Sequence, residues 1–122
     1  ITIHSAMLHM HWLGRSGKLY LKQSGKDNCL VQIPRWDFNW QMDFQLKKPI
    51  TIRSGTQVGI KCSWNNSAAN QPIVDGKKLK PKNVTWGEGT QDEMCLGLFY
   101  ITCNDADGKP ATCPDLGSFI NR

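Results

Sequence analysis

The sequence of 122 residues lacks any long helical pattern. Nowhere do apolar residues keep a period of about 3.6 over three helical turns. The sequence also lacks the run of about 18 apolar residues that a membrane-spanning helix needs. We therefore expect a soluble, globular protein with little helix and no membrane segment.

The cysteines lack the CxxC spacing that is typical of zinc and redox sites. Disulfide bonds are the other common use of cysteine, and they persist in oxidising compartments. We therefore expect a secreted, periplasmic or otherwise extracellular location. The chain begins at Ile1 without a signal-peptide pattern, so we expect it to be a piece of a longer exported precursor. The five cysteines are Cys29, Cys62, Cys95, Cys103 and Cys113.

The net charge of +5 is not accompanied by a nucleic-acid-binding pattern. Its one local cluster of lysines is DGKKLKPK, residues 75 to 82, and no aromatic residues are interleaved with it. The cluster could meet phosphate or an acidic partner, but its Asp, Gly and Pro residues favour a solvated loop. We expect no nucleic-acid partner.

Apolar residues alternate with polar ones or gather in short runs between turn residues. Several short strands separated by Gly, Asn and Asp turns are typical of an antiparallel β-sandwich or jelly roll. We expect one all-β domain over residues 1–122, stapled by disulfides. The predicted strands are ITIHSAMLHMHWL (1–13), KLYLKQ (18–23), CLVQIP (29–34), FNWQMDFQL (38–46), PITI (49–52), QVGIKCSW (57–64) and MCLGLFYIT (94–102).

Two of the three histidines, His9 and His11, are separated by one residue. Side chains alternate along a strand, so both imidazoles would face one way, and Met10 and Trp12 the other. With a third ligand from another strand, the pair would suit copper, zinc, iron or nickel. Half-buried histidines bonded to backbone groups are the alternative. His4 lies an odd number of residues from both, so on an unbroken strand it would face away and have a structural role.

The tryptophan-rich segment PRWDFNWQ, residues 34 to 41, allows two interpretations. Trp36, Phe38 and Trp40 alternate with polar residues, as they would on a strand with one packed face. A stacking platform for sugar is the alternative.

Met94 opens a predicted strand in the segment VTWGEGTQDEMCLG. By itself, a methionine at this position would normally fill an irregular gap in the core. The acidic residues before it, Glu88, Asp92 and Glu93, are expected to face solvent rather than to act in catalysis.

Four segments, HMHWLGR, PRWDFNWQ, PITIRSGTQVGIKCSW and VTWGEGTQDEMCLG, occur in order, and the resemblance they carry covers roughly residues 7 to 103. Their order and spacing resemble the second, catalytic domain of the copper type II, ascorbate-dependent monooxygenases. This is the family of dopamine β-hydroxylase and peptidylglycine α-hydroxylating monooxygenase. The resemblance implies an exported member of bacterial type.

The family's copper-binding motifs match two short stretches of the chain. HTH-x-LG matches residues 9 to 14, and EMC matches residues 93 to 95. The resemblance therefore implies that His9, His11 and Met94 bind one copper ion that cycles between Cu(I) and Cu(II). The thioether in particular favours Cu(I).

The resemblance also implies a disulfide. The family joins the cysteine after the ligand methionine to one on the neighbouring strand, which here gives Cys95 with Cys62. Cys103 and Cys113 are close in sequence and are expected to close the NDADGKPAT loop. Cys29 is then left free, buried or available to another chain.

The family's reaction inserts one oxygen atom of O2 into a C–H bond, with ascorbate supplying electrons through a second copper held by three histidines. Both sites together need more histidines than the three in this chain. We expect the catalytic-copper half, which needs the missing N-terminal three-histidine domain for turnover. The alternative is a non-enzymatic copper-binding or carrier domain, or an accessory binding module, with the same fold.

The chain departs from the peptide-amidating branch at the substrate positions. That branch holds a carboxylate with an Arg two residues before the first His and with Asn and Tyr two and four residues after the Met. Met7, Leu96 and Leu98 occupy these positions and cannot grip an anion. These three are candidate pocket residues for a small apolar or aromatic organic substrate.

Overall fold

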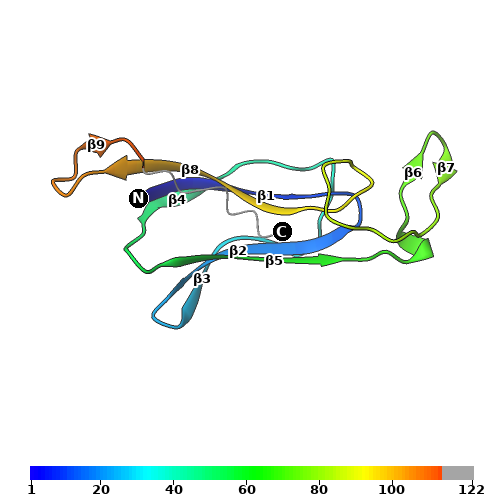
Figure 1. Cartoon of the computed structure of the whole chain (residues 1–122), viewed down its shortest axis with the longest axis horizontal. Helices are drawn as coiled ribbons and strands as arrows, with labels where there is room; N and C mark the ends of the chain where they lie inside the picture. Colours follow the sequence, from blue (N-terminus) through cyan, green and yellow to red (C-terminus); the bar gives the residue numbers. More distant parts are fainter. Residues whose placement is uncertain (114–122) are drawn as a thin grey trace.

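Two antiparallel sheets lie face to face in the computed structural model, which describes residues 1–113 (Figure 1). One sheet has the strand order β4-β1-β8-β9 and the other has the order β3-β2-β5. This arrangement confirms the predicted all-β sandwich, while residues 114–122 of the predicted domain lie outside the described residues. The strands are β1 (Thr2–Met10), β2 (Gly14–Gln23), β3 (Lys26–Ile33), β4 (Phe44–Thr51), β5 (Gln57–Trp64), β6 (Ile73–Val74), β7 (Lys77–Lys78), β8 (Cys95–Asn104) and β9 (Pro110–Ala111).

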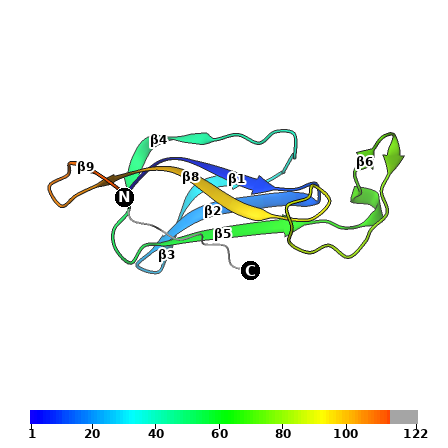
Figure 2. The same ribbon diagram turned by 45° about the horizontal axis from the view of Figure 1, so that its top comes forward.

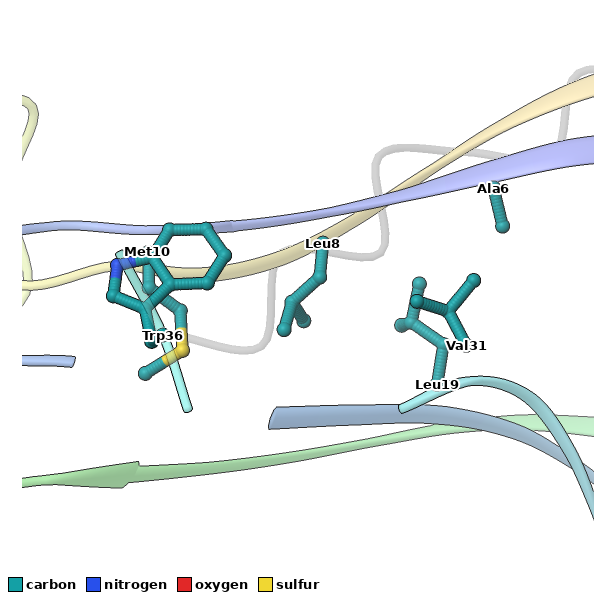
Figure 3. Close-up of a cluster of buried hydrophobic side chains, with 6 residues drawn as sticks. All are labelled: Ala6, Leu8, Met10, Leu19, Val31 and Trp36. Atoms are coloured by element: carbon teal, nitrogen blue, oxygen red, sulfur yellow. The ribbon is translucent and has the colours of Figure 1, made fainter. Parts of the chain in front are cut away.

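Apolar side chains from both sheets fill the space between them. Ala6, Leu8 and Met10 are alternate residues of β1, and all three point toward the opposite sheet (Figure 3). Leu19 from β2 and Val31 from β3 meet them there (Figure 3). Burying one such large side chain stabilises the fold by about 1.5–3 kcal/mol. Met10 is therefore a core residue, as the alternation predicts.

The central strand β1 contains an irregularity that changes which way His4 points. β1 pairs with both β4 and β8, and both pairings shift register between Ile3 and Ser5. An extra residue in a strand interrupts the alternation of its side chains. His4 consequently packs on the outer face against Tyr100, with the ring centroids 5.4 Å apart. The prediction that His4 faces away from His9 is wrong, because it assumed an unbroken strand.

The predicted strand over residues 38–46 begins only at Phe44, because a turn interrupts its first half. The Asp37 carboxylate accepts a hydrogen bond from the Asn39 N–H at 2.9 Å, and its carbonyl accepts one from the Trp40 N–H at 3.0 Å. Such local bonds from aspartate compete with strand pairing. Trp40 is therefore 71% exposed.

The prediction of a strand with one packed face is wrong for the whole tryptophan-rich segment. Trp36 alone among its three aromatic residues is fully buried and joins the core (Figure 3). Phe38 is half-buried. The segment between β3 and β4 is thus a loop anchored by one core tryptophan.

The other strand predictions differ mainly at their boundaries. QVGIKCSW corresponds to β5 residue for residue. β1 ends at Met10 rather than at residue 13, and β2 begins earlier than predicted, at Gly14. The predicted PITI strand joins the end of the preceding one to form β4.

The long connection between β5 and β8 carries small elements of its own. It contains a 3-10 turn, Ala68–Asn70, and the β6–β7 hairpin, which projects from one end of the sandwich (Figures 1 and 2). The lysine cluster lies on this hairpin with Lys77 and Lys78 exposed, in agreement with a solvated segment. In the part of the chain that the structure describes, no helix is long and apolar enough to cross a membrane.

Two disulfides join the predicted partners. Cys62 of β5 is bonded to Cys95 of β8, and Cys103 is bonded to Cys113. Both pairings are confirmed, and they indicate an oxidising environment of the extracellular type. Cys29 is an exposed free thiol.

Candidate metal centre

His9 and His11 lie where β1 ends and the chain turns toward β2. His9 is the next-to-last residue of the strand, and His11 is the first residue after it. Their ring centroids are 5.1 Å apart and the rings are nearly perpendicular, at 85°. The structure thus brings the two imidazoles together, as the HxH spacing predicts.

A side-chain amide holds the ring of His9. The His9 Nδ1 lies 2.6 Å from the Oε1 of Gln41. The other end of the same amide donates from Nε2 to the carbonyl of Phe38 at 2.8 Å, which directs the oxygen toward His9. Because that oxygen can only accept, Nδ1 carries the proton and donates it.

The backbone holds the ring of His11 in the same way. Its Nδ1 lies 3.0 Å from the carbonyl oxygen of Asp92, so this Nδ1 is also the donor. Phe38 packs edge-on against the ring with centroids 6.4 Å apart, and His11 is only 3% exposed. Its backbone carbonyl accepts a further hydrogen bond from the Trp36 indole at 3.2 Å.

These contacts leave the Nε2 atoms of both rings available. Among residues 1–113, neither the Nε2 of His9 nor that of His11 has a hydrogen-bond partner. With the proton held on Nδ1, each Nε2 presents a lone pair. Histidines that bind metals almost always donate the other ring N–H in this manner, which fixes the tautomer and the ring orientation. The donor set therefore fits a metal ion.

Met94 lies one residue beyond the end of the β1–β8 ladder that contains His9. In the ladder of β1 with β8, Met10 pairs with Cys95 and His9 pairs with Leu96. Met94 directly precedes this ladder, so it is brought to the level of His11, and it is half-buried. The described residues hold no group of three or more His, Cys, Asp or Glu arranged for a metal ion.

Glu93 is not a solvent-facing residue, contrary to the prediction. It is half-buried, and its carboxylate accepts hydrogen bonds from the backbone N–H groups of His11 and Leu13 and from the Trp64 indole. Asp92 is also half-buried and accepts a bond from the Gly89 N–H. Glu88 is exposed, as predicted.

Sequence reasoning also missed Gln41 as a partner of His9. The signal was present, because Gln41 ends the DFNWQ stretch and Glu93 begins the EMC stretch that carry the resemblance. What the sequence could not give was the contact between these residues and the histidines.

The three candidate pocket residues lie on the outer face of the sheet beside His9. Met7 pairs with Leu98, and Leu96 pairs with His9 itself. Leu98 is 50% exposed, so the three residues form an apolar strip on the strand surface. A separate cleft lies over the loop before β4 and includes none of them; its lining includes Trp12, Trp36, Phe38, Trp40 and Phe44.

The fold and the paired imidazoles define an all-β domain with a candidate metal centre at one end of its central strand. Residues 1–113 match the family described as the copper type II ascorbate-dependent monooxygenase, C-terminal domain. The chain therefore belongs to this copper- and ascorbate-dependent family, as the four motifs indicated. The matched model describes the C-terminal domain of these enzymes, so the family implies a separate N-terminal domain. No solved structure matches the chain significantly.

Proposed function

We propose that this domain binds one copper ion through the Nε2 atoms of His9 and His11 and the sulfur of Met94. The observation that carries the proposal is that both Nδ1 atoms are committed to oxygen acceptors, which leaves two adjacent Nε2 lone pairs. Two imidazoles with one soft thioether favour copper over zinc. The family's copper dependence supports the same metal.

The domain would serve as the catalytic-copper half of a monooxygenase that hydroxylates a C–H bond. When bound, copper supplies the one-electron chemistry with O2 and ascorbate on which the family depends. The hydrogen bonds from His9 to Gln41 and from His11 to Asp92 fix the orientation of the two rings, and Phe38 and Trp36 pack around His11 and shield it from bulk water. These residues would pre-orient the two histidines for metal binding.

A small apolar or aromatic molecule is the substrate class that the surface beside His9 favours. Met7, Leu96 and Leu98 offer no charge to an anionic group, and their strand register sets them next to His9. An apolar surface without charged groups favours an apolar ligand over an anion.

Turnover would require the N-terminal domain with three histidines. His4, the histidine outside the motif, is engaged with Thr102 at 2.8 Å, so the chain has no second histidine cluster to offer among its described residues. We propose that the complete protein is an exported, bacterial-type member of the family. Upstream sequence with a His-His pair and a further His would support this, whereas its absence would favour a copper carrier.

X-ray absorption on the Cu(I)-loaded protein tests the ligand set. The native protein should show two nitrogen scatterers and one sulfur scatterer. Met94→Ala should lose the sulfur scatterer, because it removes the thioether that the proposal assigns to copper. The matched control is Met42→Ala, which removes an exposed methionine and should leave the spectrum unchanged. A native spectrum without sulfur, or one that Met94→Ala does not alter, would contradict the proposed site.

A further inference from the structure

The carboxylate of Glu93 collects hydrogen bonds from two other parts of the chain. Oε1 accepts from the Leu13 N–H at 2.7 Å, and Oε2 accepts from the His11 N–H at 3.3 Å. Oε2 also accepts from the Trp64 Nε1 at 2.7 Å. Hydrogen bonds to an ionised acceptor are stronger than neutral ones. One side chain therefore joins the turn after β1, the end of β5 and the segment that leads into β8.

The two backbone donors have no strand partner. β1 pairs with β8 only as far as Met10 and Cys95, so the His11 and Leu13 N–H groups lie beyond the ladder. Buried backbone N–H groups need an acceptor, and Glu93 supplies one for each. The path of the turn that carries His11 thus depends on where this carboxylate lies.

Met94 is held between two links to the same strand. On one side, Cys95 is bonded to Cys62 of β5. On the other side, the Glu93 carboxylate accepts a hydrogen bond from the indole of Trp64, which lies two residues further along β5. The Glu93 backbone is also held, because its N–H donates to the Thr85 carbonyl at 3.1 Å. The links straddle Met94 and restrict the backbone from which its flexible side chain extends.

We propose that Glu93 is a positioning residue that sets the distance between His11 and Met94 in the copper site. This inference rests on the proposed copper ligands and adds a residue that touches neither the metal nor the substrate. Its carboxylate fixes the backbone of His11 directly and the backbone of Met94 through the adjoining peptide bond. We call the hydrogen bonds that the Glu93 carboxylate accepts from His11, Leu13 and Trp64 the clamp. Removing the clamp lets the thioether and the imidazole pair move apart without unfolding the sandwich.

Two substitutions separate the position of the carboxylate from its charge. Glu93→Gln keeps the length of the side chain but turns one acceptor into an NH2 group that faces a donor. Glu93→Asp keeps the charge but is one methylene too short to reach the same donors. Both should weaken Cu(I) affinity by about 10–100-fold, as expected when a group that orients metal ligands is lost. Both should also lower the Cu–S contribution to the X-ray absorption spectrum.

Glu88→Gln is the matched control, because Glu88 is an exposed carboxylate in the same loop. Its affinity and Cu–S scattering should equal those of the native protein. Circular dichroism and thiol titration would show that each variant keeps its fold and its Cys62–Cys95 bond. If folded Glu93→Gln or Glu93→Asp binds Cu(I) like the native protein, the positioning role is wrong. If the native protein itself lacks the sulfur scatterer, the copper-site proposal fails instead.

Trp64→Phe decides the question if neither Glu93 variant folds. The indole is 46% exposed, so the substitution removes one donor to the carboxylate with little loss of packing. A several-fold weaker affinity for Cu(I) with reduced Cu–S scattering would support the clamp. Native affinity in folded Trp64→Phe would overturn it.

Discussion

Single side chains of one type occupy very different environments in this domain, as the methionines illustrate. Met10 lies between the two candidate histidine ligands in sequence, yet it is 0% exposed and packs in the core (Figure 3). Met94 is half-buried at the level of His11. Met42 is 45% exposed. Residue type alone therefore does not separate a core methionine such as Met10 from a partly exposed one such as Met94.

Met10→Ala should reduce the free energy of unfolding by about 2–5 kcal/mol, because it removes a buried side chain and leaves a cavity. The control Met42→Ala should change stability by no more than about 0.5 kcal/mol, as is usual for surface positions. Urea denaturation of both variants provides the measurement. Similar losses in the two variants would contradict the assignment of Met10 to the core.

At the scale of elements, the contact between β5 and β8 is important because it joins the two sheets covalently. These strands belong to different sheets and share no backbone ladder. The Cys62–Cys95 bond joins them across a sequence separation of 33 residues, with Cα atoms 6.1 Å apart. The other disulfide, Cys103–Cys113, closes a separation of only 10 residues at the β8–β9 hairpin.

Removing each disulfide should therefore have a different consequence. By loop-closure entropy, the Cys62→Ala/Cys95→Ala double variant should lose about 4 kcal/mol of stability, and the Cys103→Ala/Cys113→Ala variant about 3 kcal/mol. Only the first should also weaken Cu(I) binding, because only the first bond lies next to Met94. Denaturation curves and Cu(I) competition titrations measure the two effects. Equal Cu(I) affinities in the two folded variants would contradict the link between β5 and the metal centre.

Several elements could be predicted from the sequence because they depend on local alternation. QVGIKCSW corresponds to β5 because nothing within it competes with strand pairing. The segment before Phe44 could not be predicted, because the bonds from Asp37 outcompete an apparently regular alternation. The prediction of the direction in which His4 points was wrong for a related reason, because a bulge depends on how both neighbouring strands pair.

At the scale of the whole molecule, the number of histidines limits the number of histidine-based copper sites that the chain could form. The chain has three histidines, of which His9 and His11 are adjacent and His4 lies on the same face near Thr102. A site with three imidazoles therefore cannot be added to a site that uses two. This supports a division of labour between this domain and a separate N-terminal domain.

Copper binding should accordingly saturate at one Cu(I) per chain. Equilibrium dialysis followed by metal analysis measures this ratio. The His9→Ala/His11→Ala double variant should reduce tightly bound copper to near zero, because it removes both Nε2 donors. Two tightly bound ions per native chain would contradict the single-site interpretation.

The sequence by itself determined the class of fold through alternation and the family through four ordered motifs; the resemblance then implied the Cys62–Cys95 bond, and closeness in sequence indicated Cys103–Cys113. It also determined that two imidazoles would lie together, because HxH spacing acts through the backbone period. Only the tertiary structure decided which ring nitrogens are free and that Glu93 holds the turn of His11. These outcomes depend on hydrogen bonds between residues as far apart as Glu93 and His11, which are 82 positions apart. Such partners meet only when β1, β5 and β8 have taken their places in the sandwich.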